Sequence, residues 1–243
     1  MSAKPIIYVS GGLLGDLIHQ LSIINEIYLN TGRMGILYIR ENPAFRFDLT
    51  TTYNDTYTII SRQPYIENYA IWNGEKYEID LSIWRRSYIH NGSWKKIFTS
   101  VHGVDWASSP WLTFERRNPQ FESKIVICCS DVEYRFPDKI NFNKLFTDLG
   151  MENIVFVTQS IVEYDNFCSR TETKLNLYKT SSIEDFVTCI NSCSLFIGNA
   201  SSPLTFAYAL HKKTITILNS THADNIYFLS LSLPYNENMI EYN

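Results

Sequence analysis

Two strand–loop–helix patterns, one in each half of the chain, most strongly constrain how this sequence can fold. The first runs from an apolar strand pattern at 6–9 into a helical pattern at 17–29, and the second from 195–197 into 204–210. In both, the connecting loop consists largely of small residues. A helix that begins after such a loop leaves backbone N–H groups and the positive end of its dipole available to an anion. The two patterns therefore predict two α/β domains that share one phosphate-bearing ligand.

Strand and helix patterns alternate on both sides of a segment that has neither. Residues 105–120 are rich in Ser, Pro and Trp with poor periodicity, and we interpret them as the connection between domains 1–118 and 119–243. Alternation of this kind implies parallel sheets with helical crossovers. The predicted fold class is therefore α/β, with two Rossmann-like domains whose parallel sheets face each other across a cleft.

Individual elements follow from the apolar spacing. Further strands are expected at 35–39, 57–60, 125–129, 154–157, 175–178 and 214–218. Helices are expected at 16–30, 64–69, 94–101, 141–149, 183–192 and 203–210. Asn73-Gly74 predicts a turn between 70–72 and 77–79, and the last twenty-odd residues show no core pattern.

Composition excludes several classes of protein. The net charge of −4 argues against a nucleic-acid partner, which needs a concentrated basic face. No apolar run approaches the ~20 residues of a transmembrane helix, and the N-terminus lacks the pattern of a secretion signal. The five cysteines lie mostly in apolar segments without paired C-x-x-C spacing. These features predict a cytoplasmic chain with no transmembrane segment and no metal site.

The glycines of the first loop have two interpretations. Gly12 and Gly15, with Gly11, follow a strand and precede a helix, as in the pyrophosphate loop of dinucleotide-binding folds. Ser10 replaces the first glycine of that motif, so the match is incomplete. The alternative is that the glycines let the strand pack closely on its helix, and spacing alone favours this alternative.

Asp16 and His19 are the candidate catalytic residues of the first half. Asp16 has the residue type of a helix N-cap, which position alone favours, but it also lies where α/β ligands bind and could act as a general base. His19 follows it by one helical turn on the same face. The pair would place two proton-transfer groups at one point, although a lone helical histidine is usually part of the core.

The loop at 130–137 follows the first strand of the second half. Its sequence, Ser-Asp-Val-Glu-Tyr-Arg-Phe-Pro, offers the Ser130 hydroxyl and the Arg135 guanidinium to a diphosphate. A surface salt bridge from Arg135 to Asp131 or Glu133 is the simpler interpretation, and without further context it is favoured.

Two segments resemble a known family. Gly-Asp-Leu-Ile-His-Gln-Leu at 15–21 is similar to the Gly-Asp-x-x-His-x-Leu signature of family 9 glycosyltransferases, the heptosyltransferases of lipopolysaccharide core assembly. Phe-Ile-Gly-Asn-Ala-Ser-Ser-Pro at 196–203 resembles their Phe-Ile-Gly-Asn-Asp-Ser-Gly-Pro loop. The 130–137 loop occupies the place of their donor-phosphate loop, which also ends in an aromatic-Pro pair. The motifs occur in the family's order and span both halves.

The resemblance implies a compact GT-B fold and a role for each motif. Asp16 matches the proposed base that activates the acceptor hydroxyl, and the C-terminal loop matches the site of the donor diphosphate and sugar. The implied donor-binding residues are Gly12, Gly15, Ser130, Arg135, Asn199, Ser201 and Ser202. The chain departs from the family at Ala200, Ser202 and Thr205, which replace Asp, Gly and His, and Arg135 lies one position from the family's phosphate-loop lysine.

Three functions follow as hypotheses. The first is an inverting glycosyltransferase that transfers a sugar from a nucleotide-diphosphate sugar to a hydroxyl of a glycan, glycolipid or glycoprotein, with no metal or other cofactor. The second is an NAD(P)-dependent oxidoreductase that uses only the first glycine loop. The third is a non-catalytic sugar-nucleotide or glycan-binding module, for which Ala200 is the best argument. Cofactor titration distinguishes the second hypothesis, and turnover with a bound donor distinguishes the third.

Overall fold

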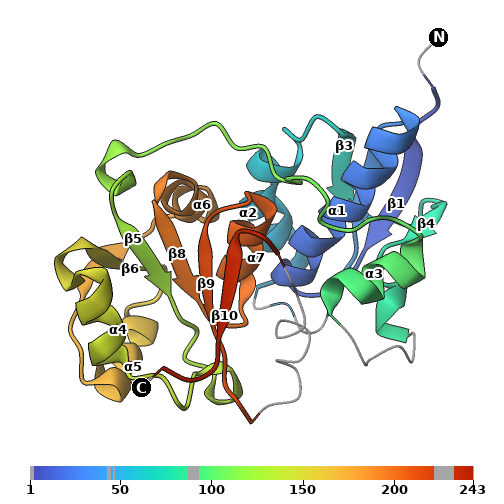
Figure 1. The fold of residues 1–243 in the computed structure, drawn as a ribbon. Coiled ribbons are helices and arrows are strands. Elements are labelled where there is room, and N and C mark those ends of the chain that lie inside the picture. Colours follow the sequence, from blue (N-terminus) through green and yellow to red (C-terminus); the bar gives the residue numbers. More distant parts are fainter. Residues whose placement is uncertain (1–2, 43–44, 46, 87–92, 222–232, 243) are drawn as a thin grey trace. The chain divides into compact units, whose positions relative to one another are not determined.

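The computed structural model describes residues 3–42, 45, 47–86, 93–221 and 233–242 (Figure 1). The chain divides into two compact units, Met1–Phe114 and Glu115–Asn243. Each unit is built on its own parallel sheet, with a helix between most pairs of successive strands. This organisation confirms the predicted α/β class with two Rossmann-like parallel sheets.

The first unit has a four-stranded sheet in the order β3-β2-β1-β4, all parallel. Its strands are β1 (Ile6–Ser10), β2 (Gly35–Ile39), β3 (Ile66–Ile71) and β4 (Ile79–Asp80). Its helices are α1 (Leu14–Thr31), α2 (Leu49–Ile60) and α3 (Trp94–His102). The central strand β1 is almost fully buried, so the loop that follows it leaves the middle of the sheet at its carboxyl edge.

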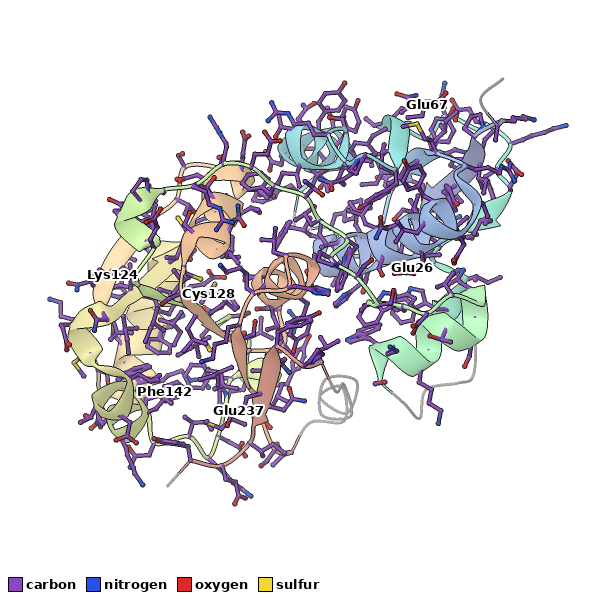
Figure 2. The ribbon with its side chains drawn as sticks, turned by 45° about the horizontal axis from the view of Figure 1, so that its top comes forward. Glu26, Glu67, Lys124, Cys128, Phe142 and Glu237 are labelled. Carbon is purple, nitrogen blue, oxygen red and sulfur yellow. The ribbon has the colours of Figure 1, made fainter. Side chains whose placement is uncertain are left out.

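The second unit has a six-stranded parallel sheet in the order β10-β9-β8-β5-β6-β7. Its strands are β5 (Ile125–Cys128), β6 (Ile154–Thr158), β7 (Asn176–Lys179), β8 (Leu195–Gly198), β9 (Thr214–Ile217) and β10 (Asn236–Met239). Its helices are α4 (Phe142–Leu149), α5 (Ile161–Thr171), α6 (Ile183–Ser192) and α7 (Ser202–Ala209). Phe142 of α4, Phe167 of α5, and Ile125 and Ile127 of β5 belong to one apolar core. Figure 2 labels Phe142 in this unit.

Two predicted elements of the first unit are wrong. Residues 57–60, predicted as a strand, are the last turn of α2, and residues 64–69, predicted as a helix, largely belong to β3. Asp48 caps α2 by accepting a hydrogen bond from the Thr51 N–H at 2.9 Å, and Thr56 donates its hydroxyl to the Thr52 carbonyl within the helix. Threonines therefore form part of the buried face of α2, so the spacing of large apolar residues alone does not reveal this helix.

The segment expected to connect the domains is mostly part of the first unit. Trp106 and Trp111 are almost completely buried. Their indole N–H groups donate to the carbonyls of His19 at 3.0 Å and Ile18 at 2.8 Å, both on α1. Because the first unit extends to Phe114, the irregular sequence after α3 forms a packed arm along α1.

Two elements of the second unit do not follow from the apolar spacing of the sequence. Helix α5 begins with a capping box signal, Ser-x-x-Glu, in which Ser160 accepts from the Glu163 N–H, and this signal alone could have located it. Strand β10 lies in the segment that shows no core pattern. It pairs with β9 at the sheet edge, where its residues are only half-buried, so it lacks a continuous apolar run.

Candidate active site

The first group of predicted site residues lies at the carboxyl end of β1. The backbone N–H of Leu13, the residue before α1, donates to Oδ2 of Asp16 at 2.8 Å. Asp16 is thus in the first turn of the helix rather than at the N-cap position, although its carboxylate does satisfy a backbone donor there. Its side chain is largely buried at this edge of the sheet.

The Gly11-Gly12 loop is shaped by the side chains on either side of it. Gly12 has φ of +123°, and a β-carbon built on it would lie 2.7 Å from Oδ2 of Asp16. On the other side, Gln20 donates to the Gly11 carbonyl at 3.1 Å and accepts from the Ser10 hydroxyl at 2.7 Å. The loop therefore contains Gly12 because Asp16 lies against it. This agrees with the close-packing interpretation of the glycines.

Gly15 and His19 both lie on α1, but in different surroundings. Gly15 is in the first turn, next to Asp16. His19 is 1% exposed, and the centroid of its ring lies 5.3 Å from the ring centroids of both Trp94 and Trp106. Within the part of the chain that the structure describes, neither of its ring nitrogens has a hydrogen-bond partner. Burial lowers the pKa of His19 to about 3, so the imidazole is neutral at pH 7.

A charged group that no sequence motif indicated lies at the same sheet edge. Nη2 of Arg40, directly after β2, donates to Oδ2 of Asp80 at 3.1 Å and to Oδ1 at 3.2 Å, and also to the hydroxyl of Ser82. Hydrogen bonds from Ser82 and the charge of Arg40 hold the pKa of Asp80 below its usual value, against the opposing effect of burial. No local motif marks these residues, because β2 and β4, which are distant in the sequence, bring them together.

The second group lies at the carboxyl edge of the other sheet, where β5 and β8 are neighbours. Asn199 is fully buried, and its amide connects the loops that follow these two strands. It accepts from the Ser130 N–H at 3.0 Å and donates to the carbonyls of Ser130 at 2.9 Å and Arg135 at 3.2 Å. Asn219, after β9, donates to the Phe136 carbonyl at 2.8 Å. The 130–137 loop is therefore held from two strand ends.

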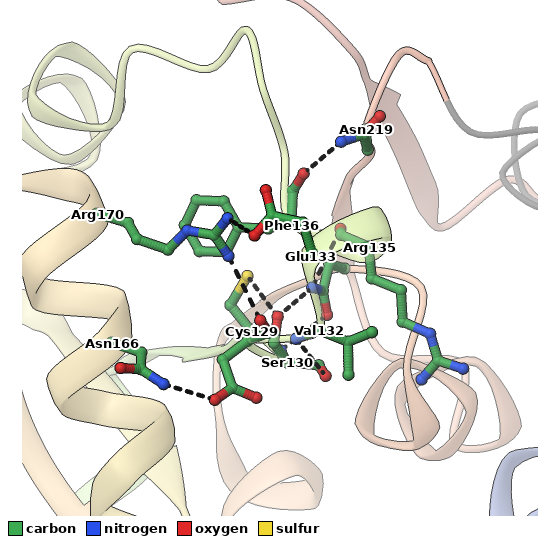
Figure 3. A network of polar contacts seen from close by, with 11 residues as sticks. Cys129, Ser130, Val132, Glu133, Arg135, Phe136, Asn166, Arg170 and Asn219 are labelled. Atoms are coloured by element: carbon green, nitrogen blue, oxygen red, sulfur yellow. Dashed lines mark hydrogen bonds and ion pairs between the residues drawn. The ribbon is translucent and has the colours of Figure 1, made fainter.

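The acidic residues of this loop pair with α5 and not with Arg135. Arg170 forms an ion pair with Glu133 and lies 4.1 Å over the Phe136 ring, and Asn166 donates to Asp131 at 2.7 Å (Figure 3). The simpler interpretation of Arg135 as a surface salt bridge to these acids is therefore wrong.

Arg135 itself is half-buried and points away from that network (Figure 3). Its guanidinium lies 5.2 Å from the Tyr134 ring, and across the described ranges it forms no ion pair or hydrogen bond. A half-buried cation without a counter-ion is costly for a protein to maintain, which favours a ligand anion at this place.

The start of α7 adds a backbone donor to this edge. Ser201 precedes the helix, but its hydroxyl donates to the Asn199 carbonyl at 3.2 Å and does not cap the helix N–H groups. Ser202 is the first residue of α7 and is half-buried, and Ala200 is buried. Pro203 has no N–H, and the Leu204 N–H donates to the Ser201 carbonyl at 3.1 Å. The Ser202 N–H therefore remains at this uncapped helix end as a donor suited to an anion.

The predicted site residues therefore form two groups. Gly12, Gly15 and Asp16 lie in the first unit, and Ser130, Arg135, Asn199, Ser201 and Ser202 lie in the second. No cluster of three or more His, Cys, Asp or Glu side chains suited to a metal ion occurs among the residues with described positions. Over the same residues, none of the helices combines the length and apolar character needed to cross a membrane.

No protein-family model matches the chain, and no curated protein matches it. Solved structures do match in fold. The E. coli heptosyltransferase WaaC with ADP-2-deoxy-2-fluoro heptose has a TM-score of 0.62 at 10% identity, over 98% of this chain and 93% of that one. A family 9 glycosyltransferase from Veillonella parvula has a TM-score of 0.60 at 13% identity, over 98% and 87%.

A third similar structure is the iron-containing dodecameric glycosyltransferase TibC from enterotoxigenic E. coli. Its TM-score is 0.65 at 11% identity, over 98% of this chain and 63% of that one. At these identities the similarity is one of fold. The matches confirm the GT-B architecture that the sequence motifs predicted and the resemblance to family 9 at the level of fold.

Proposed function

We propose that this chain is a glycosyltransferase that transfers a sugar from a nucleoside-diphosphate sugar to a hydroxyl group of a glycan, glycolipid or glycoprotein. The single observation that carries the proposal is Arg135, a half-buried guanidinium that lies by the Tyr134 ring but forms no ion pair or hydrogen bond across the described residues. It belongs to a loop that Asn199 connects to the uncapped start of α7. The Arg135 cation and the start of α7 together suit a diphosphate.

In the donor site, Arg135, the Ser130 and Ser202 hydroxyls and the backbone N–H of Ser202 hold the diphosphate. Asn199 acts by fixing the two loops, because its amide is already fully used in doing so. These donors meet the negative charge that develops on the diphosphate as the sugar leaves, and a preorganised group of this kind lowers the barrier.

Asp16 is the proposed general base. The acceptor oxygen attacks the anomeric carbon while its proton passes to the Asp16 carboxylate. The bond from that carbon to the diphosphate oxygen breaks, and the diphosphate leaves with the bonding electrons, so the configuration is inverted. His19 is omitted from this step, because its buried, neutral ring faces aromatic side chains and no described polar group.

We assign acceptor binding to the first unit and donor binding to the second, in line with the expected domains 1–118 and 119–243. No metal or other cofactor is included in the proposed reaction. A cytoplasmic location is proposed from the five cysteines, all of which are free thiols.

The decisive experiment is calorimetry with ADP, GDP, UDP and their sugars, followed by a transfer assay with the donor that binds. Saturable binding of a nucleoside diphosphate and transfer of its labelled sugar to an acceptor would support the proposal. Binding without any transfer would favour the non-catalytic module, to which the substitution of the family's aspartate by Ala200 points. Binding of NAD(P) in place of these ligands would overturn the proposal.

A further inference from the structure

The connection between β3 and β4 contains an asparagine followed by a glycine in an open turn. Asn73 and Gly74 are both exposed, and Gly74 has φ of +95°. Apart from its neighbours in the chain, nothing described lies within 4 Å of the place that a β-carbon on Gly74 would take. Because Gly74 has no side chain and no other segment covers it, its backbone nitrogen can be approached from the side of residue 73.

Glu75 holds this turn without engaging the Asn73 side chain or the Gly74 nitrogen. Its Oε2 accepts from the Asn73 backbone N–H at 2.6 Å, and its carbonyl accepts from the Trp72 indole N–H at 2.8 Å. Among the residues with described positions, neither the Asn73 side-chain amide nor the Gly74 N–H forms a hydrogen bond. The amide carbon of Asn73 can therefore meet the Gly74 nitrogen without the loss of a native hydrogen bond.

Other asparagines of the described chain lack this combination. Asn54 is also exposed, but it lies in α2, where the next backbone N–H belongs to the helical hydrogen-bond ladder. Asn199 is buried, and its amide is fully used. The other Asn-Gly pair of the sequence, at 91–92, lies outside the described residues. Asn73 is thus the one described asparagine that precedes a glycine.

We propose that Asn73 is a site of spontaneous deamidation in which the Gly74 backbone nitrogen is the nucleophile. This nitrogen forms a bond to Cγ of Asn73 and gives up its proton. The Cγ–Nδ2 bond breaks, and Nδ2 leaves as ammonia with the bonding electrons and that proton. Water then opens the cyclic imide at either of its two carbonyls, which yields aspartate or isoaspartate at residue 73. The step needs only water and is independent of the proposed function.

The modification changes the turn in which it occurs. Oε2 of Glu75 lies at the Asn73 backbone N–H, so the product places a second carboxylate within the same turn. Like charges at short range repel each other. Isoaspartate also adds one carbon to the backbone of the connection between β3 and β4. We therefore expect the modified turn to lose its contact with Glu75 and the native state to become less stable.

The test is incubation of the full-length protein in heavy-oxygen water, followed by digestion and mass spectrometry. We expect the peptide with residue 73 to change from amide to acid with one heavy oxygen, and to do so faster at pH 8 than at pH 6, because the attacking nitrogen must lose its proton. An isoaspartate methyltransferase with a labelled methyl donor measures isoaspartate, which direct hydrolysis of the side chain does not produce. The peptide with Asn54 is the internal control and should keep its amide.

Two kinds of variant separate the reaction from its effect on the turn. Gly74→Ala places a methyl group beside the attacking nitrogen and is expected to slow the conversion by at least about tenfold. Asn73→Asp introduces the charge without the reaction and is expected to lower the midpoint of urea unfolding. Adding Glu75→Gln to that variant keeps an oxygen for the residue 73 N–H but removes the repulsion, so the midpoint should recover.

An amide that persists at residue 73 would overturn the inference, as would aspartate without isoaspartate or equal conversion rates in the wild type and Gly74→Ala. An unchanged unfolding midpoint in Asn73→Asp would overturn the effect on the turn. The wild-type incubation needs no variant, so the site is tested even where a variant does not fold. None of these measurements uses a sugar donor, so failure of the proposed function leaves the inference standing.

Discussion

Gly12 and Asp16 are matched to each other: a β-carbon on Gly12 would come within 2.7 Å of Oδ2 of Asp16. The positive φ of Gly12 adds to this requirement. The glycine and the aspartate of the first motif therefore form one local structure, in which the backbone makes space for the carboxylate.

This relationship predicts that Gly12→Ala is more destabilising than the same substitution at a glycine with no atoms near the place of its β-carbon. Gly74 is the matched control, since it also has positive φ but nothing lies within 4 Å of the place its β-carbon would take. We expect Gly74→Ala to cost about 1 kcal/mol of the free energy of unfolding, and Gly12→Ala to cost about 1–3 kcal/mol more. Urea unfolding measures both. Equal costs would show that the contact with Asp16 is not tight.

Asp16→Asn tests the proposed base. Asparagine can still accept the hydrogen bond from Leu13, so we expect a loss of stability of at most about 1 kcal/mol. An amide cannot take the acceptor's proton, so turnover should fall by about 10²–10⁴-fold with donor affinity unchanged. Melting, calorimetry and rate assays on one preparation give the three values. A variant that keeps more than about a tenth of the turnover would leave Asp16 with a structural role only.

Arg135→Ala tests the donor site. Removing the unpaired guanidinium should weaken nucleoside-diphosphate binding by about 1.5–3 kcal/mol, the range of charge-assisted hydrogen bonds. Lys139→Ala is the control, because Lys139 is an exposed cation of the same unit that is already paired with Glu241. Calorimetry should show a loss for the first variant alone. Equal affinities in both would remove Arg135 from the site.

Acid should destabilise the first unit through His19 and His102. Burial lowers the pKa of His19 to about 3 and that of His102 to about 4, whereas a histidine in the unfolded chain titrates near 6.5. Below pH 6.5 the unfolded state therefore binds protons that the native state does not. This contribution to stability is complete above pH 6.5 and is lost as the pH falls toward the folded values.

For His19 the expected loss is about 1.4 kcal/mol per pH unit over this range. His19→Phe should reduce the slope and preserve turnover at pH 7, because the ring is buried among aromatic side chains. Urea unfolding at pH 7 and pH 4.5 checks the slope. An unchanged slope in His19→Phe would show that His19 is not the titrating group. Loss of turnover in a folded His19→Phe variant would show that His19 takes part in the reaction.

Sugar transfer should continue in EDTA. The proposed site meets the charge of the leaving diphosphate with Arg135 and the start of α7, and the sequence has no Asp-x-Asp after a strand of its first half. TibC, whose fold is similar, is an iron-containing glycosyltransferase. The EDTA measurement therefore tests whether transfer by this chain also needs a metal. Activity lost in EDTA and restored by a divalent ion would contradict the prediction.

Local signals were sufficient for much of the fold. The strands with continuous apolar runs and the helices that end at Gly32 and Gly103 were predictable, because a buried parallel strand and a glycine C-cap each leave a short-range mark. Helix α2 was not, since its buried face includes Thr52 and Thr56, and the Thr56 hydroxyl bonds within the helix and to Tyr69. Strand β10 depends on pairing with β9, which no local pattern records.

The candidate site, like the fold, could be predicted from the sequence only in part. Asp16, Arg135 and Asn199 lie in short motifs, so their residue types and positions could be identified. Their surroundings could not, because the acid that pairs with Arg170 and the group that orients Arg40 come from distant parts of the chain. Without these contacts, the sequence could not distinguish an unpaired Arg135 from an ordinary surface salt bridge.

The aromatic packing of the first unit has a spectroscopic consequence. All five tryptophans of the chain occur between positions 72 and 111, so the second unit contains none. Selectively excited tryptophan emission therefore reports on one unit only. Comparing it with far-ultraviolet circular dichroism, which detects both units, would reveal whether they unfold together or in sequence, without any label.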